Sequence, residues 1–194
     1  MEHASVQKMA KVLRVLVLAA FVLNLLVMPL VPGLVVQMVG EGPGQMFGTL
    51  KAMFGLLGSE EQLSVWQYVL TALCWVWTDR TLALVTVFFW LCGVCTAVIL
   101  WQAKKVLDTV LQGSPFQQAN TRALKRAAVC CWIISGASLV RLVVWLWADG
   151  TLAPLFTYTT LFVPAFFMGG LLFLVMSALF GQAAELKEDQ DLTI

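Results

Sequence analysis

Four long apolar runs divide this chain, and each has about the length that a helix needs to cross a bilayer. They cover residues 12–31, 81–101, 127–147 and 161–180. Because about 20 predominantly apolar residues span the hydrocarbon core, each run predicts one transmembrane helix. The first run is too long for the apolar core of a cleaved signal peptide, so it predicts an uncleaved span. Pro29 and Pro32 should loosen the end of that span.

The polar island between the second and third runs, residues 102–126, predicts a helical elbow. Gly113 can end one helix. Ser114 as N-cap, Pro115 at the first helical position and Gln117 three residues after the cap can start the next. The pattern therefore predicts a tight turn at Gly113 and a helix that begins at Pro115.

Residues 41–80 form the longest segment between two runs, and their pattern is amphipathic. Apolar residues recur at helical spacing over 46–57 with Lys51 on the opposite face, which is typical of a helix lying in the membrane interface. Ser59 and Gln62 form a second capping box, which opens a helix reaching Trp77 that is too short to span. The whole chain, 1–194, is thus expected to be one all-α integral membrane domain, a four-transmembrane-helix bundle with interfacial helices in its first extracytoplasmic segment.

Composition agrees with this architecture. The chain is 60% hydrophobic and 12% charged, whereas soluble domains are about 25% charged. With a net charge of +1 and no basic stripe among aromatic residues, it gives no support for direct nucleic-acid binding.

The basic residues predict which side of the membrane each segment faces. Nine lie in the N-terminal segment, the elbow and the C-terminal tail, while only Lys51 and Arg80 lie on the other side. Basic loops stay in the cytoplasm, so the elbow and both termini should be cytoplasmic. Tryptophans should mark the two interfaces, the outer one by 75, 77, 145 and 147 and the inner one by 101 and 132.

Small residues four apart predict where helices touch, because they let two backbones approach closely. The pairs are Gly93 with Ala97, Ala165 with Gly169, and Ser177 with Gly181. Residues 136–138 of the third span also have small side chains. These positions favour one compact bundle over four separate anchors.

Arg141 is the only charged residue well inside a predicted span. An intramembrane charge is costly and needs a partner. Candidates are Asn24, Asp79, Asp149 and backbone carbonyls near Pro164. Three roles stay open for Arg141: a structural ion pair, a side chain that lifts its charge to the interface, and a ligand or signalling site.

The residues offer little for catalysis or metal binding. Cys92 and Cys95 have the spacing of a redox motif, but they lie in mid-span, where thiolates are poorly stabilised. Cys130 and Cys131 are expected to be packing residues or an acylation site. With His3 as the one histidine, we expect no catalytic residues, no metal and no cofactor.

The elbow and the tail are the candidate docking surfaces for a partner. The tail, 182–194, carries four acids against one lysine and emerges on the side of the basic elbow. It is either a solvated end or an element that docks on the elbow or on a cytosolic protein. The candidate docking residues are Lys104, Lys105, Pro115, Phe116, Asn120, Arg122, Lys125 and Arg126 in the elbow, and Glu185, Glu188, Asp189, Asp191, Leu192 and Ile194 in the tail.

Three parts of these segments resemble a known family. They are Pro115-Phe116 followed by Asn120, then 124–126 leading into a span, and the ending 185–194 with its Asp-Leu-Thr-Ile. This pattern is similar to bacterial four-span membrane proteins grouped as domain of unknown function 2975. The resemblance implies a small helix-turn-helix regulator, encoded beside the gene, as a partner, and it implies no catalytic residues.

Three functions are compatible with the sequence. The first is a non-enzymatic sensory or regulatory membrane protein that holds a cytosolic helix-turn-helix regulator by its elbow and tail. The second is a small transporter or channel, as a homo-oligomer in the bilayer, although the spans offer few polar residues for a path. The third, a quinone-coupled thiol oxidoreductase, is the least favoured.

Overall fold

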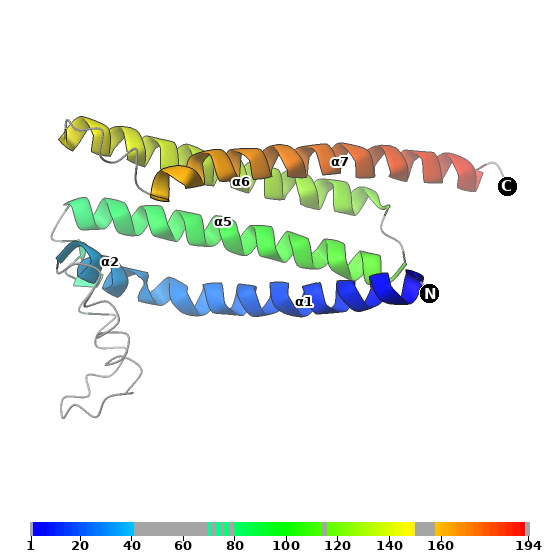
Figure 1. Ribbon diagram of the computed structural model, residues 1–194, viewed down its shortest axis with the longest axis horizontal. Helices are drawn as coiled ribbons and strands as arrows, with labels where there is room; N and C mark the ends of the chain where they lie inside the picture. The colour runs from blue at the N-terminus through cyan, green and yellow to red at the C-terminus, as the bar shows by residue number, and fades with distance from the viewer. Residues whose placement is uncertain are drawn as a thin grey trace, which may run out of the picture. The chain divides into compact units, whose positions relative to one another are not determined.

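The computed structural model describes residues 2–40, 70, 73–74, 76–77, 80–113, 116–149 and 158–192, with side chains described over 8–35, 80–113, 116–147 and 160–190 and at the isolated positions between 70 and 77. Its elements are α1 (Glu2–Val27), the 3₁₀ turn η1 (Met28–Leu30), α2 (Val31–Gly40), α5 (Arg80–Leu111), α6 (Gln118–Asp149), the 3₁₀ turn η3 (Tyr158–Leu161) and α7 (Phe162–Leu192) (Figure 1). None of the described residues is in a strand. The interfacial helices expected over 46–57 and 59–77 lie outside the described residues apart from five positions.

Four helices are long and apolar enough, by length and composition, to cross a membrane. They are Lys8–Val35, Arg80–Leu111, Gln118–Trp147 and Phe162–Gln190. Large apolar side chains are exposed along all four, up to Trp147 at 93%. Since such a surface suits hydrocarbon and not water, the chain is an all-α, multi-pass membrane protein, as the apolar runs predict.

The helices run further than the apolar runs do. α5 continues ten residues beyond Trp101, α6 begins nine residues before Ala127, and α7 continues through the acidic tail to Leu192. The polar island is therefore mostly helix, and the elbow itself is only residues 112–117.

Gly113 ends α5 in the way that the sequence predicts. Its φ is +76°, and its N–H donates to the carbonyl of Val110 at 3.1 Å. Glycine adopts this left-handed conformation without a steric penalty. The prediction that the next helix begins at Pro115 is wrong, because α6 begins at Gln118. Gln117 caps the first turn instead, and its carbonyl accepts the N–H of Asn120 at 2.9 Å.

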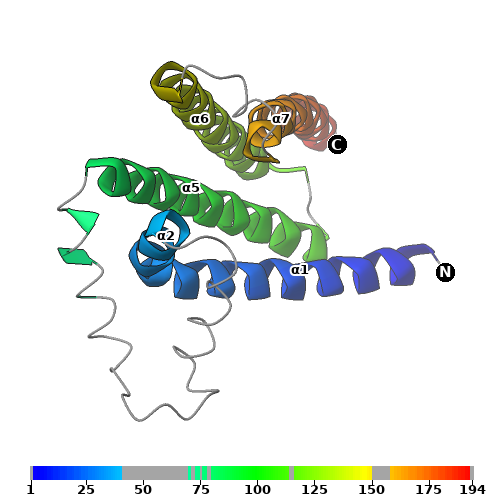
Figure 2. The same cartoon turned by 60° about the vertical axis from the view of Figure 1, so that its left-hand side comes forward.

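The described chain divides into two units, and each is described by itself. Unit 1 comprises Met1–Leu23 and Val94–Ile194, and unit 2 comprises Asn24–Gly93. In unit 1 the antiparallel helices α6 and α7 lie side by side in both views (Figure 2).

A seven-residue repeat of small side chains forms the seam between α6 and α7. The Ser177 hydroxyl donates to the carbonyl of Thr121, and the Ser135 hydroxyl donates to the carbonyl of Val163, both at 2.9 Å. Midway between these contacts, Gly170 lies against the carbonyl of Ala128. Successive contacts are thus seven residues further along α6 and seven residues earlier along α7. A seven-residue repeat of this kind is typical of two helices that wind around each other with a left-handed twist.

Burial on α7 follows the same repeat. Gly170, Ser177 and Ala184 are buried, while their neighbours in the chain are exposed or half-buried. The predicted contacts at Ser177 and Gly181 are confirmed, since a Cβ on Gly181 would lie 3.5 Å from Thr121 Cγ2. The contact predicted at Gly169 is wrong for the described part of the chain, where no atom lies within 4 Å of a Cβ built there. Adjacent helical residues point about 100° apart, so only one of two neighbouring glycines can face α6.

In the third span, too, the contact is made by a residue next to the glycine and not by the glycine itself. A Cβ on Gly136 would meet no atom of the described residues within 4 Å, whereas the adjacent Ser135 and the nearby Ser138 are buried. The polar hydroxyl of Ser135, and not the open backbone of Gly136, therefore makes the contact with α7.

Unit 2 contains the proline break at the end of α1. Pro32 has no N–H, so the carbonyl of Met28 lacks its usual helical donor four residues later. That carbonyl instead accepts the N–H of Val31 in a 3₁₀ turn and the indole Nε1–H of Trp90 on α5, at 3.1 Å. The expectation that the two prolines loosen this end is confirmed, and an indole replaces the lost backbone bond. Gly93 also confirms its predicted role, since a Cβ there would lie 3.1 Å from the end of the Met28 side chain.

The two adjacent glycines of α7 provide a matched test of the seam. Gly170→Ala would place a methyl group against the Trp132 indole and 3.3 Å from the Ala128 carbonyl. We expect a loss of about 1–3 kcal/mol in the free energy of unfolding, as overpacking usually costs. Gly169→Ala should be neutral or stabilising by up to about 1 kcal/mol, because alanine favours helix. Thermal unfolding of both variants in detergent measures this difference, and equal midpoints would contradict the seam.

The indole bond at the proline break predicts a coupling between two residues. Trp90→Phe removes the donor to Met28 and should destabilise the protein by about 0.5–1.5 kcal/mol. In a Pro32→Ala background the restored N–H can satisfy that carbonyl, so the same Trp90→Phe change should cost less. A double-mutant cycle of unfolding free energies measures the coupling. Strict additivity of the two changes would show that the bond contributes nothing.

Candidate functional site at the elbow end of unit 1

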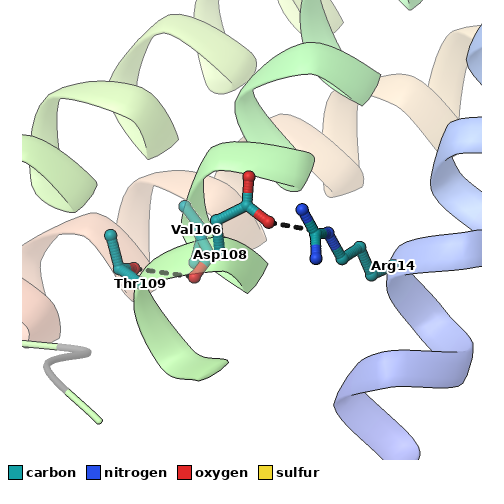
Figure 3. A network of polar contacts seen from close by, with 4 residues as sticks. All are labelled: Arg14, Val106, Asp108 and Thr109. Atoms are coloured by element: carbon teal, nitrogen blue, oxygen red, sulfur yellow. Dashed lines mark hydrogen bonds and ion pairs between the residues drawn. The ribbon is translucent and has the colours of Figure 1, made fainter. Parts of the chain in front are cut away.

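An ion pair joins α1 to α5 near the elbow. Arg14 Nε lies 2.8 Å from Asp108 Oδ1 (Figure 3). Asp108 Oδ1 is shielded from solvent and accepts no hydrogen bond from the described residues, so its contact with Arg14 is a charge pair. Arg14 follows directly on the polar start of α1, and Asp108 is the only acid of the island. Their ion pair neutralises both charges at the edge of the apolar region, where an unpaired charge would be costly.

Two aromatic rings make the next contact between α1 and α5, about two helical turns from the ion pair. The rings of Phe21 and Trp101 are 5.7 Å apart, and Lys104 Nζ lies 5.1 Å from the Trp101 ring centroid. From Arg14 to Phe21 is seven residues forward, and from Asp108 to Trp101 is seven residues back, so the pairing of α1 with α5 in unit 1 is antiparallel. A cation over an indole is stabilised by about 0.5–1 kcal/mol at an exposed site.

A partly buried chain of hydrogen bonds joins α5 to α6 across the elbow. Asn120 Nδ2 donates to Thr109 Oγ1 at 2.6 Å, and Thr109 Oγ1 donates to the carbonyl of Val106 at 2.7 Å. Figure 3 shows Thr109 and Val106 on the same helix as Asp108. Asn120 is 2% exposed. Asn120 was expected among the docking residues, and the structure instead shows its amide buried in a bond between two helices.

The elbow loop is anchored on α7 by an aromatic pair. The rings of Phe116 and Phe180 are 5.6 Å apart. Phe116 lies in the non-helical connection and remains 46% exposed, so it can both hold the loop and offer an apolar contact. Pro115, predicted beside it, lies outside the described residues.

Charged side chains surround this end and most are exposed. Lys104 is half-buried beside Trp101, whereas the other four basic residues of the island are exposed: Lys105, Arg122, Lys125 and Arg126. No acid other than Asp108 lies in this stretch. The elbow therefore presents a basic surface, which suits acidic groups of lipid or protein.

The end of α7 carries the opposite charge. After the buried Ala184, residues 185–190 are all exposed, and they include Glu185, Glu188 and Asp189. Eight residues from Glu185 to Leu192 extend α7 by about 12 Å at the usual rise. No basic residue lies in the last turn of α7. Acidic groups at a helix C-terminus are unfavourable for the helix dipole, so this acidic extension gains stability from a basic partner. The side chains of Asp191 and Leu192, and all of Ile194, lie outside the description.

Arg141 is half-buried in α6 and takes part in an interaction. Among its predicted partners, Asp79 and the Asp149 side chain lie outside the described residues. Asn24 belongs to unit 2 and Arg141 to unit 1. The carbonyl of Val163, next to Pro164, accepts the Ser135 hydroxyl. The role of Arg141 stays a prediction.

The contacts that sequence reasoning missed are the pairs between helices. The sequence could have predicted the ion pair of Arg14 with Asp108, since a single acid among basic residues is expected to pair with one of them. The bonds of Ser177, Ser135 and Asn120 had a weaker signal, because small polar residues in apolar helices commonly bond to a neighbouring helix. Nothing in the sequence indicates which carbonyl each would reach.

Among the residues that the structure describes, no three His, Cys, Asp or Glu side chains are grouped so as to hold a metal ion. What the elbow end offers chemically is complementary charge: a basic surface on α5 and α6 and an acidic helix on α7. Such an arrangement suits binding of another molecule by electrostatic contact.

Comparison with known proteins identifies the family of the chain. No curated protein and no solved structure matches the chain. A family model described as "Protein of unknown function (DUF2975)" matches residues 59–194, which include α5, α6 and α7 with the elbow and the acidic end. The match covers well over half of the chain and bears out the resemblance of the elbow and tail; the chain belongs to this DUF2975 family.

Proposed function

We propose that this protein is a non-enzymatic regulatory protein of a bacterial inner membrane, which holds a cytosolic helix-turn-helix transcription regulator at its elbow end. Its elbow and both termini lie in the cytoplasm. The regulator binds the acidic end of α7 and is released when the membrane domain responds to a signal.

The observation that carries the proposal is the exposed acidic end of α7. Glu185, Glu188 and Asp189 stand on a helix whose surface is open from residue 185 to residue 190. A DNA-binding regulator has a basic face, because most of its affinity for DNA comes from contacts to phosphates. An acidic helix is complementary to that face and competes with DNA for it.

The distribution of basic residues supports the orientation. Lys8, Lys11 and Arg14 of α1 and the basic residues of the island belong to unit 1, at the elbow end. Moving such a cluster across a bilayer is strongly disfavoured. The Phe116–Phe180 contact supports a joint role for the elbow and the tail, since it ties the loop to α7 one turn before the buried Ala184.

Removing the acidic charge should weaken binding of the regulator. In a variant carrying Glu185→Gln, Glu188→Gln and Asp189→Asn, we expect affinity for the neighbouring-gene regulator to fall about tenfold, since three exposed charge pairs contribute about 1–3 kcal/mol together. Binding to full-length protein in lipid nanodiscs, titrated at several salt concentrations, measures the change.

Lys187→Gln is the matched control, because it removes one charge of the opposite sign from the same exposed stretch. It should leave binding unchanged or strengthen it. In the same assay, excess operator DNA should displace the regulator from the wild-type protein. Equal affinity of the triple variant and the wild type would rule out the acidic helix as the binding element.

The orientation makes a separate prediction. Alkaline phosphatase, which is active only outside the cytoplasm, should be inactive when fused after Ile194 or inserted at Gln112, and active when fused after Trp147. Fluorescent-protein fusions should show the reverse pattern. An active phosphatase at Gln112 would place the elbow outside the cytoplasm, where a cytosolic regulator could not bind it, and would contradict the proposal.

A further inference from the structure

The exposed residues at the start of α6 form one stripe, which changes from basic to apolar along the helix. Between residues 122 and 133 the exposed positions are Arg122, Lys125, Arg126, Val129, Trp132 and Ile133. At about 100° per residue, these positions all lie within an arc of about 120° around the helix. The first three, nearest the elbow, are basic, and the rest are apolar. We call this surface the α6 stripe.

The α6 stripe faces away from the helices that pack on α6. Asn120, which bonds to Thr109 of α5, points about 180° away from the centre of the stripe. Ala128, which lies in the seam with α7, points about 100° away from it. Val129 in the stripe accordingly remains 52% exposed. Among the described residues, neither α5 nor α7 covers this surface, so it is open to whatever surrounds the protein.

The positive charge of the α6 stripe is not offset within α6. The helix has no acid before Asp149, at its far end. The ion pair described at this end of unit 1 joins Arg14 to Asp108 and uses none of the basic residues of the stripe. Arg122 and Arg126 are four residues apart, about 6 Å along the helix, with Lys125 between them. Positive charges gathered on one exposed face attract an anion.

The change from basic to apolar along the stripe selects an amphiphile as the occupant. Val129 lies three residues after Arg126, about 4.5 Å along the helix. From Arg126 the helix then carries no charge until Arg141, about 22 Å further on. That length exceeds the hydrocarbon of one leaflet, about 15 Å, so an acyl chain can lie along it. An acidic protein segment would match the basic residues alone, whereas an anionic lipid matches both parts of the stripe.

We propose that the α6 stripe binds an anionic phospholipid. The head-group phosphate lies on Arg122, Lys125 and Arg126, and the acyl chains run along Val129 and Ile133. Guanidinium groups bind phosphate oxygens with two parallel hydrogen bonds, and a lysine adds a third positive charge. The inference does not depend on the proposed function or on which side of the membrane the elbow faces, because phospholipid head groups line both surfaces of a bilayer.

Counting the lipids bound to the purified protein tests the proposal. Full-length protein in a neutral detergent is titrated with phosphatidylglycerol or with phosphatidylcholine of the same acyl chains, and native mass spectrometry counts the bound lipids. We expect the first phosphatidylglycerol to bind about tenfold more tightly, because its head group has a net negative charge and three exposed charge contacts together amount to about this factor. Equal affinity for the two lipids would overturn the proposal.

Removing the basic residues of the stripe should remove this preference. In a variant carrying Arg122→Gln, Lys125→Gln and Arg126→Gln, both lipids should bind with equal affinity. All three side chains are exposed, so the fold should be kept. Far-UV circular dichroism and the unfolding midpoint in phosphatidylcholine check that it is. A folded variant that still prefers phosphatidylglycerol tenfold would overturn the assignment to these residues.

A second variant with the same net charge is the matched control. Lys8→Gln, Lys11→Gln and Lys105→Gln remove three exposed positive charges from unit 1 outside the stripe. This variant should keep the tenfold preference for phosphatidylglycerol, because the stripe is intact. An equal loss of preference in both variants would show that overall charge, and not the α6 stripe, attracts the lipid.

Two soluble anions distinguish a phospholipid from other occupants. Glycerol phosphate shares the head group, and a synthetic peptide of residues 182–194 supplies an acidic protein segment. Neither should displace phosphatidylglycerol from the wild-type protein, because neither has a chain to lie along Val129 and Ile133. Displacement by glycerol phosphate would reduce the surface to a phosphate site. Displacement by the peptide would assign it to an acidic protein, and either result would overturn the proposal.

Discussion

Helices in hydrocarbon are not drawn together by the hydrophobic effect, because lipid is as apolar as the helix surface. The contact between α6 and α7 therefore depends on close approach of the backbones and on bonds made by small polar side chains. Ser177 and Ser135 each donate to a carbonyl of the opposite helix, and Gly170 leaves room between them. A larger residue at Gly170 would separate the helices and stretch both serine bonds.

The position of the candidate site follows from this seam. Because the contacts repeat every seven residues, the last of them places Phe180 beside Phe116, in the loop just before α6. α7 then continues past that level, and its acidic residues emerge where no other described helix of the seam covers them. The charge that we propose for partner binding is thus presented by a helix whose register is set by serine and glycine contacts deeper in the protein.

The elbow end combines two kinds of polar group with different roles. Asp108 is used within the protein by Arg14, and Asn120 is used by Thr109, so these residues hold helices together. The remaining basic residues of the island are mostly exposed and keep their charge available. The same sequence stretch therefore contains both the polar contacts that join the helices and an exposed basic surface.

The sequence by itself determined the fold class, the four spanning helices, the proline break and the glycine turn. Each of these depends on local properties: apolar length, the missing N–H of Pro32, and the freedom of Gly113 at positive φ. Only the tertiary structure decided which face of each helix is used, because a shift of one residue turns a side chain by about 100°. For this reason Gly170 and not Gly169 meets α6, and the start of α6 moves from Pro115 to Gln118.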